Sequence, residues 1–181
     1  MSDIHGNRHA AEAVVADAAE QGVDRWWVLG DLVAIGPEPV GTVELVANLP
    51  GVQITSGNTE RYVLTDDRPP PFAEDVIAEP ALLPLYGAVQ RSFAWTAGAL
   101  AAHGLLGCLS TLPLEVREVL PDGTDILGVH ASPGRDDGAG ITPHRPEEEL
   151  RRDLVGANAG LVFAGHTHQP TDRVVDGVRA V

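Results

Sequence analysis

Short, nearly continuous apolar runs alternate along the chain with segments of helical pattern. Runs of this length without polar alternation are typical of strands buried on both faces, usually in parallel sheets. We expect such strands at 25–29, 51–55, 126–129 and 161–164, a half-exposed strand at 115–120, and a final hairpin at 173–181. Helices are expected at 10–20, 39–48 and from residue 146 onward, the first of them capped by Asn7. This alternation predicts an α/β fold.

Residues 66–84 differ from the flanking segments in their proline content. Five prolines fall between 69 and 84, and proline breaks regular structure, so we expect an irregular excursion there. The following stretch, 85–109, is expected to be helical, in two pieces around Gly98 or Gly104. No internal repeat divides the chain, and 181 residues suit one domain, so we expect a single domain over 1–181.

Polar residues of metal-ligating type follow several of the predicted strands. They are Asp31, Asn58, His130, His166 and His168, with Asp3 placed where a further strand would end. In open α/β sheets the ligand crevice lies outside the carboxyl ends of the strands, so five separate segments deliver these side chains toward one rim. A single histidine after a strand is most often structural. The ordered set of five segments predicts a metal centre instead.

Charge narrows the choice of partners. The chain has 12 basic residues, all arginine, against 26 acidic ones, a formal charge of −14. This excess argues against non-specific binding to nucleic acid or to an anionic membrane, but bound cations would still permit an anionic substrate. One cysteine excludes an intramolecular disulfide and a cysteine-based zinc cluster. No apolar leader opens the chain, and a soluble, cytoplasmic setting is expected.

Five short blocks together resemble the ordered motifs of the calcineurin-like metallophosphoesterases, in the manner of their small bacterial members. The resemblance extends from Ser2 to about Pro170. The blocks are Ser2-Asp3-Ile4-His5-Gly6-Asn7, Gly30-Asp31-Leu32-Val33-Ala34-Ile35-Gly36-Pro37, Gly57-Asn58-Thr59-Glu60, Val129-His130-Ala131-Ser132-Pro133 and Gly165-His166-Thr167-His168. The resemblance implies a sandwich of mixed β-sheets flanked by helices, with residues 66–112 as a variable, partly helical insertion that covers one side of the site.

The same resemblance implies a site with two divalent metal ions. Asp31 would bridge the two ions, and Asn58 would serve both as a ligand and as a catalytic residue. The first ion would be held by Asp3, His5 and His168, and the second by Asn58, His130 and His166. Mixed carboxylate, amide and imidazole ligands suit Mn, Fe, Zn or Ni. Two such ions would share a hydroxide that attacks phosphorus.

One position departs from the family pattern. Thr59 stands where many members carry the histidine that protonates the leaving group, and a threonine hydroxyl is too weak an acid for that task. His9, one helical turn past His5, is a candidate replacement, and Arg8 is a candidate phosphate contact.

The expected function is metal-dependent hydrolysis of a phosphomonoester or phosphodiester, with a small phosphorylated compound as substrate. Two alternatives stay open. One is a non-catalytic scaffold of the same fold. The other is a phosphoprotein phosphatase or a dinucleoside-polyphosphate hydrolase, because the motifs are shared by all of these enzymes.

The resemblance also suggests a chain truncated at both ends, because an apolar strand normally precedes Asp3. We therefore expect no strand over residues 1–3, an open apolar slot beside the neighbouring strand, and Asp3 and His5 as the least securely held ligands. Unpaired backbone groups there would make the chain unstable or prone to aggregation.

Overall fold

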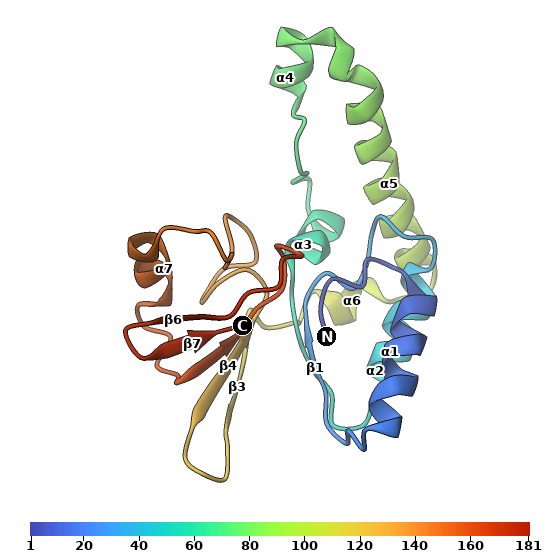
Figure 1. The fold of residues 1–181 in the computed structure, drawn as a ribbon. Coiled ribbons are helices and arrows are strands. Elements are labelled where there is room, and N and C mark those ends of the chain that lie inside the picture. The colour runs from blue at the N-terminus through green and yellow to red at the C-terminus, as the bar shows by residue number, and fades with distance from the viewer.

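The computed structural model describes residues 1–181 and is drawn in Figure 1. The first half contains α1 (Arg8–Glu20), β1 (Trp27–Leu29), α2 (Pro39–Ala47), β2 (Gln53–Thr55), α3 (Asn58–Leu64), α4 (Ala73–Ala78), the 3₁₀ helix η1 (Pro80–Leu82) and α5 (Leu83–Ala102). The second half contains α6 (Leu106–Leu109), β3 (Glu115–Val119), β4 (Asp125–Val129), α7 (Glu147–Leu154), β5 (Leu161–Phe163), β6 (Arg173–Val175) and β7 (Val178–Ala180).

The strands form two sheets. β1 and β2 pair in parallel, and the other five strands form a mixed sheet in the order β3-β4-β5-β7-β6. Both parallel pairs on which the site depends, β1 with β2 and β4 with β5, come from the short apolar runs that the sequence marks as buried strands. The predicted α/β class with mixed sheets and flanking helices is confirmed.

Two apolar cores hold these layers together. The first packs β1 against α2 and α5 and includes the buried Val28, Val46 and Leu100. The second lies between the mixed sheet and α7 and includes Leu127 and Leu150. The carboxyl ends of β1, β2, β4 and β5 meet between the two cores. The candidate ligands predicted from the sequence follow these strand ends.

Residues 66–112 contain a helical arm that projects from the body (Figure 1). Helix α5 supports it, because Phe93, Thr96 and Leu100 recur on one face and are buried against the first core. The helical stretch is interrupted at Gly104, which has φ +70° and separates α5 from α6. The expectation of an irregular stretch over 66–84 is wrong for residues 73–78 and 80–84. The first segment forms α4, where the Asp75 carboxylate accepts a hydrogen bond from the Phe72 N–H, and the second forms η1 and the start of α5.

Residues 1–3 form no strand, as expected, but they lie beside β1 with strand-like hydrogen bonds. The Met1 amino group donates to the Trp27 carbonyl, the Leu29 N–H donates to the Met1 carbonyl, and the Asp3 N–H donates to the Gly30 carbonyl. A mainly apolar cavity of about 430 Å³ lies next to Met1, lined by residues that include Trp27, Leu29 and Phe163. The backbone groups of β1 that we expected to be unpaired therefore have partners in residues 1–3, so that part of the expectation is wrong.

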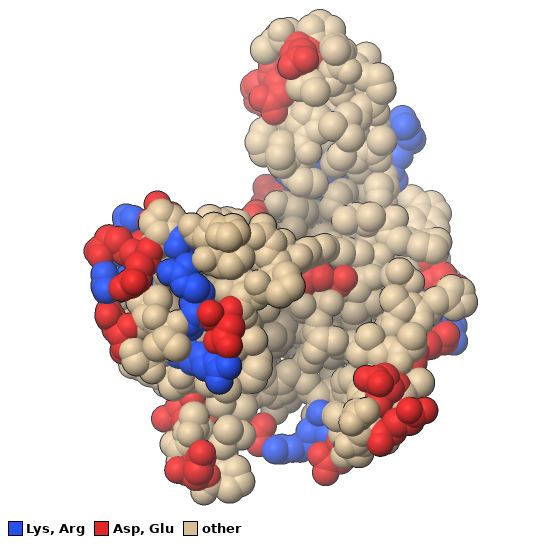
Figure 2. Space-filling view, viewed as in Figure 1, with Lys and Arg blue, Asp and Glu red and all other residues tan.

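No helix is both long and apolar enough to cross a bilayer. Most arginines on the face shown in Figure 2 lie close to acidic side chains, whereas the blue side chains at the edge of the arm stand apart from them. Arg151 pairs with Asp176, and Arg179 pairs with Asp172. The excess of acidic residues therefore leaves few basic groups without a partner on this face.

Candidate metal centre

The first predicted group of ligands converges at the surface. His168 Nε2 lies 3.2 Å from Asp3 Oδ1 and 3.4 Å from His5 Nε2. The Asp3 carboxylate also accepts a hydrogen bond from the His166 N–H, at 3.1 and 3.0 Å to its two oxygens. Burial lowers the pKa of His5 despite the nearby carboxylates, so this imidazole favours the neutral form that binds metal.

The second predicted group is more deeply placed. Asn58 Oδ1 lies 3.0 Å from His130 Nε2 and 2.9 Å from His166 Nδ1. The far nitrogen of each ring contacts a backbone carbonyl, His130 Nδ1 at 2.7 Å from Leu29 O and His166 Nε2 at 2.9 Å from Gly138 O. If these far nitrogens carry the protons, the lone pairs of His130 Nε2 and His166 Nδ1 both face the Asn58 oxygen.

Asp31 lies between the two groups. Its Oδ2 is 3.7 Å from His5 Nε2, and its Oδ1 is 3.4 Å from His130 Nε2. Burial raises the pKa of Asp31, but the hydrogen bond and charge of His130 outweigh burial and leave the pKa below its ordinary value. Asp31 is therefore ionised and has one oxygen toward each group, a placement that would let it bridge two ions.

These residues fit a pair of divalent ions. Ligand-type atoms of the second group and of Asp31 lie 2.9–3.4 Å apart. Bonds of about 2.0–2.2 Å to one ion place neighbouring ligands at such separations. Histidine ligands commonly donate their other N–H to a carbonyl, as His130 and His166 are placed to do. Burial alone would lower the pKa of His130, but Asp31 raises it to about 9, so the site attracts positive charge.

Backbone strain concentrates at this site. Five of the seven predicted ligands have positive φ, between 50° and 69°: Asp3, His5, Asp31, His166 and His168. Only a few per cent of non-glycine residues adopt this conformation, and such strain clusters at functional sites. The left-handed turns redirect the chain at the strand ends, where these side chains meet.

Glu60 is a residue of the site that the sequence analysis did not single out. Its fully buried carboxylate accepts four backbone hydrogen bonds, from Gly57, Asp31, Leu32 and Val33. It thereby ties the backbone after β1 to the start of α3, on which Asn58 lies. Its position three residues after Gly57, where an acidic residue reaches back to a helix N-terminus, was the available signal.

Two glycines allow the ligand segments to approach closely. A Cβ at Gly57 would overlap the Asp31 side chain, and a Cβ at Gly165 would overlap Asp3. Any side chain at either position would push a ligand out of place.

The structure does not bring the two predicted substrate contacts into the site. Arg8 pairs with Glu12 on the surface of α1, with Nε 2.8 Å from Oε1, and the His9 side chain is 85% exposed beside the same carboxylate. His5 and Gly6 have left-handed backbone, so the helix that carries His9 begins only at Arg8. Helical spacing from His5 therefore does not direct His9 to the ligands.

Thr59 contacts a predicted ligand, and does not take the position of a residue that donates a proton to the substrate. Its N–H and its hydroxyl both donate to Asp31 Oδ1, at 2.9 and 3.0 Å. The side chain is almost fully buried. Thr59 therefore orients the Asp31 carboxylate.

The expectation that Asp3 and His5 are the least securely held ligands differs from what is observed. Both have paired backbone N–H groups, Asp3 with Gly30 O and His5 with Asp31 O. The most exposed ligand is His168, whose side chain is 57% accessible.

The chain belongs to the calcineurin-like phosphoesterase superfamily, because the model of that domain matches residues 1–181. It is 31% identical over 175 residues to an uncharacterised protein of the archaeon Methanocaldococcus jannaschii, covering 94% of this chain and 61% of that protein. The chain thus spans less than two thirds of the length of this curated relative.

Solved structures share the fold. A hypothetical protein from Pyrococcus horikoshii matches with a TM-score of 0.76 at 18% identity, covering 100% of this chain and 73% of that one. A metallophosphoesterase from Sphaerobacter thermophilus matches with a TM-score of 0.70 at 29% identity, covering 98% of this chain and 63% of that one.

Proposed function

We propose that this protein hydrolyses phosphate esters at a centre that holds two divalent metal ions. The observation that carries the proposal is the convergence of ligand-type atoms, with His130 Nε2 3.0 Å from Asn58 Oδ1 and 3.4 Å from Asp31 Oδ1, next to a second group that Asp31 also faces. Membership of the phosphoesterase superfamily and the name of the Sphaerobacter thermophilus relative support it. The complete set of ligand-type residues favours an enzyme over a scaffold.

The chain's own residues would prepare the site for this chemistry. Asp31 would be shared between the ions, with Thr59 and Glu60 fixing its side chain and backbone. His130 and His166 would be held in one orientation by their carbonyl partners. Bound divalent ions supply positive charge for the phosphate oxygens and a nucleophilic water at neutral pH.

The test compares Asp31→Asn with Asp17→Asn, a change at an exposed position of α1. Each protein is loaded with Mn²⁺ or Zn²⁺, its metal content is measured, and hydrolysis of p-nitrophenyl phosphate and bis(p-nitrophenyl) phosphate is followed. We expect Asp31→Asn to lower metal affinity and activity by at least about 100-fold, because ligand loss exceeds the effect of losing a residue behind a ligand. Asp17→Asn should leave both unchanged.

Two outcomes would contradict the proposal. Metal binding at two ions per chain without hydrolysis of any ester would support the scaffold interpretation. Hydrolysis that survives Asp31→Asn at the wild-type rate would place the activity elsewhere.

A further inference from the structure

A cavity of about 440 Å³ opens beside the metal centre. One side of it carries five of the predicted ligands. The opposite side is formed mainly by small and apolar residues of α5 and of the segments around it. Residues on that side include Ile35, Pro69, Ala88, Val89 and Phe93.

Ile35 is the least expected part of this wall. It is a β-branched residue at φ +69°, a conformation that costs such residues more than others, and 69% of it is exposed. An isoleucine in this state contributes little to the apolar core. Its conformation is held by the adjacent turn, in which the Gly36 N–H donates to the carbonyls of Ala34 and His5. Backbone strain at an exposed apolar residue beside a candidate site, as at Ile35, points to a contact between that side chain and a ligand.

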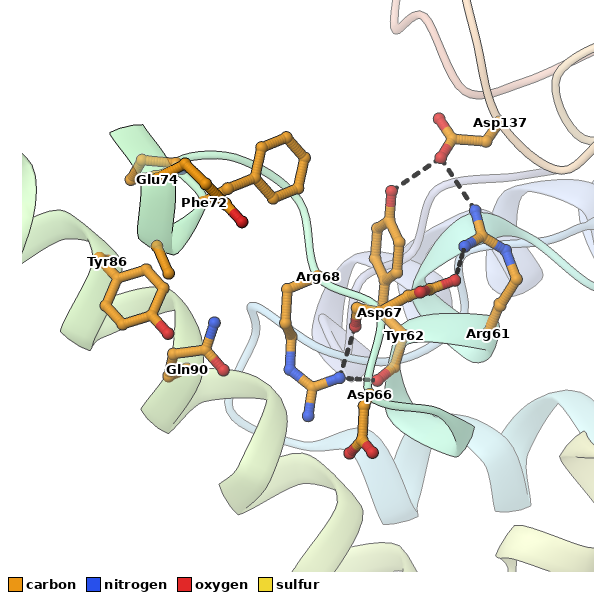
Figure 3. A pocket seen from close by; sticks show the side chains of 12 residues that line it. Arg61, Tyr62, Asp66, Asp67, Arg68, Phe72, Glu74, Tyr86, Gln90 and Asp137 are labelled. Atoms are coloured by element: carbon orange, nitrogen blue, oxygen red, sulfur yellow. Dashed lines mark hydrogen bonds and ion pairs between the residues drawn. The ribbon is translucent and has the colours of Figure 1, made fainter. Parts of the chain in front are cut away.

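No arginine lines this cavity, although arginine is the chain's only basic residue. Arg61 and Arg68 line a neighbouring cavity of about 470 Å³, which shares Tyr62 with this one (Figure 3). Arg61 binds three aspartates there, and Arg68 Nη1 contacts three backbone carbonyls. A second phosphate or a carboxylate on a substrate would therefore meet no side-chain cation beyond the metal centre.

We propose that the cavity selects esters with a single phosphate group and an apolar, uncharged substituent of about the size of an aryl ring, which packs on Ile35 and Val89. This inference rests on the proposed function and specifies its substrate class. Polyphosphates and acidic phosphopeptides are disfavoured, because their additional negative charges would lie against an apolar wall with no side-chain cation.

The test measures binding of stable phosphonates to the metal-loaded protein by calorimetry. Phenylphosphonate should bind about tenfold more tightly than methylphosphonate, because the ring removes apolar surface from water. 3-Phosphonopropionate, which carries a carboxylate, should bind no more tightly than methylphosphonate.

Ile35→Asn separates a binding role from a structural one. Asparagine tolerates the left-handed conformation better than isoleucine, so the thermal midpoint should stay the same or rise. The preference for phenylphosphonate should nevertheless fall to less than about threefold, because the apolar contact is lost. Val89→Thr should reduce the preference in the same direction. Gln90→Ala, on the part of α5 that lines the neighbouring cavity, is the matched control and should leave the preference unchanged.

Each outcome has a distinct meaning. If neither methylphosphonate nor phosphate binds, the proposed function itself fails. If both bind but phenylphosphonate binds no more tightly, or if 3-phosphonopropionate binds best, only the assignment of an apolar substituent is overturned. An unchanged preference in Ile35→Asn would show that the ring packs elsewhere.

Discussion

Replacing Glu60 with glutamine is expected to weaken both the fold and the metal centre. Four backbone N–H groups donate to its carboxylate at 2.8–3.2 Å, those of Gly57 and Asp31 to Oε2 and those of Leu32 and Val33 to Oε1. Glutamine keeps one oxygen and turns an NH₂ donor toward two of these N–H groups. Two buried donors lose their acceptor, and each costs about 1–3 kcal/mol, so we expect a loss of about 2–6 kcal/mol.

The measurement is thermal unfolding at pH 8, with and without divalent metal. Burial and the charge of Asp31 raise the pKa of Glu60 to about 7, so at pH 8 the wild-type carboxylate is mostly ionised. For a chain of this length the expected loss lowers the midpoint by about 4–24 °C. Metal affinity should fall about 10-fold to 100-fold, because Glu60 fixes the backbone of Asp31.

Glu12→Gln is the matched control, since it removes the same charge from an exposed pair with Arg8 and should change stability by less than about 1 kcal/mol. The reasoning is refuted if Glu60→Gln melts within about 2 °C of the wild type and binds metal equally well, because a 1 kcal/mol loss already shifts the midpoint that far. The four N–H groups would then have other partners.

Three further predictions concern the site and its surroundings. Without metal, His130 has a pKa of about 9 against an ordinary 6.5, so between these pH values the folded apoprotein holds a proton that the unfolded chain releases. The free energy of unfolding of the apoprotein should therefore be highest below pH 6.5 and fall toward pH 9. Denaturant titrations at several pH values measure this fall, which the metal-loaded protein should lack. With Thr59 in place of histidine, hydrolysis should depend steeply on the pKa of the leaving group across a series of aryl and alkyl esters, and Thr59→His should flatten that dependence. The cavity beside Met1 should bind an environment-sensitive apolar dye in the folded chain; a folded chain that does not bind the dye would contradict this.

Most of the strands could be predicted from sequence because they lie in short, mainly apolar runs. The runs predicted at 25–29, 51–55, 126–129 and 161–164 all contain strands. The candidate ligands that follow these strands lie together because the carboxyl ends of parallel strands share one edge of a sheet. Helix α3 was missed, because it has only seven residues and Asn58 follows the strand almost directly.

The local direction of the chain could not be predicted. Whether Asp3 and His5 face His168 depends on left-handed backbone at positions where composition permits either conformation. The same uncertainty misplaced His9, whose predicted direction assumed that the helix already included His5. Ile35 could not be assigned to a cavity wall, because its neighbours there come from α5, more than 50 residues away in the chain.

The hydrogen bond between the His166 N–H and the Asp3 carboxylate joins positions 163 residues apart. Ions held by Asp3, His5 and His168 would add to this link and close a loop of nearly the whole chain. Closing a long loop removes more conformational freedom from the unfolded chain than closing a short one, although the dependence on length is weak. Because contacts between distant segments form slowly, the centre would assemble late in folding. Once formed, it would link the first and last segments of the chain. Removing the metal would then release both segments together, in addition to stopping the chemistry.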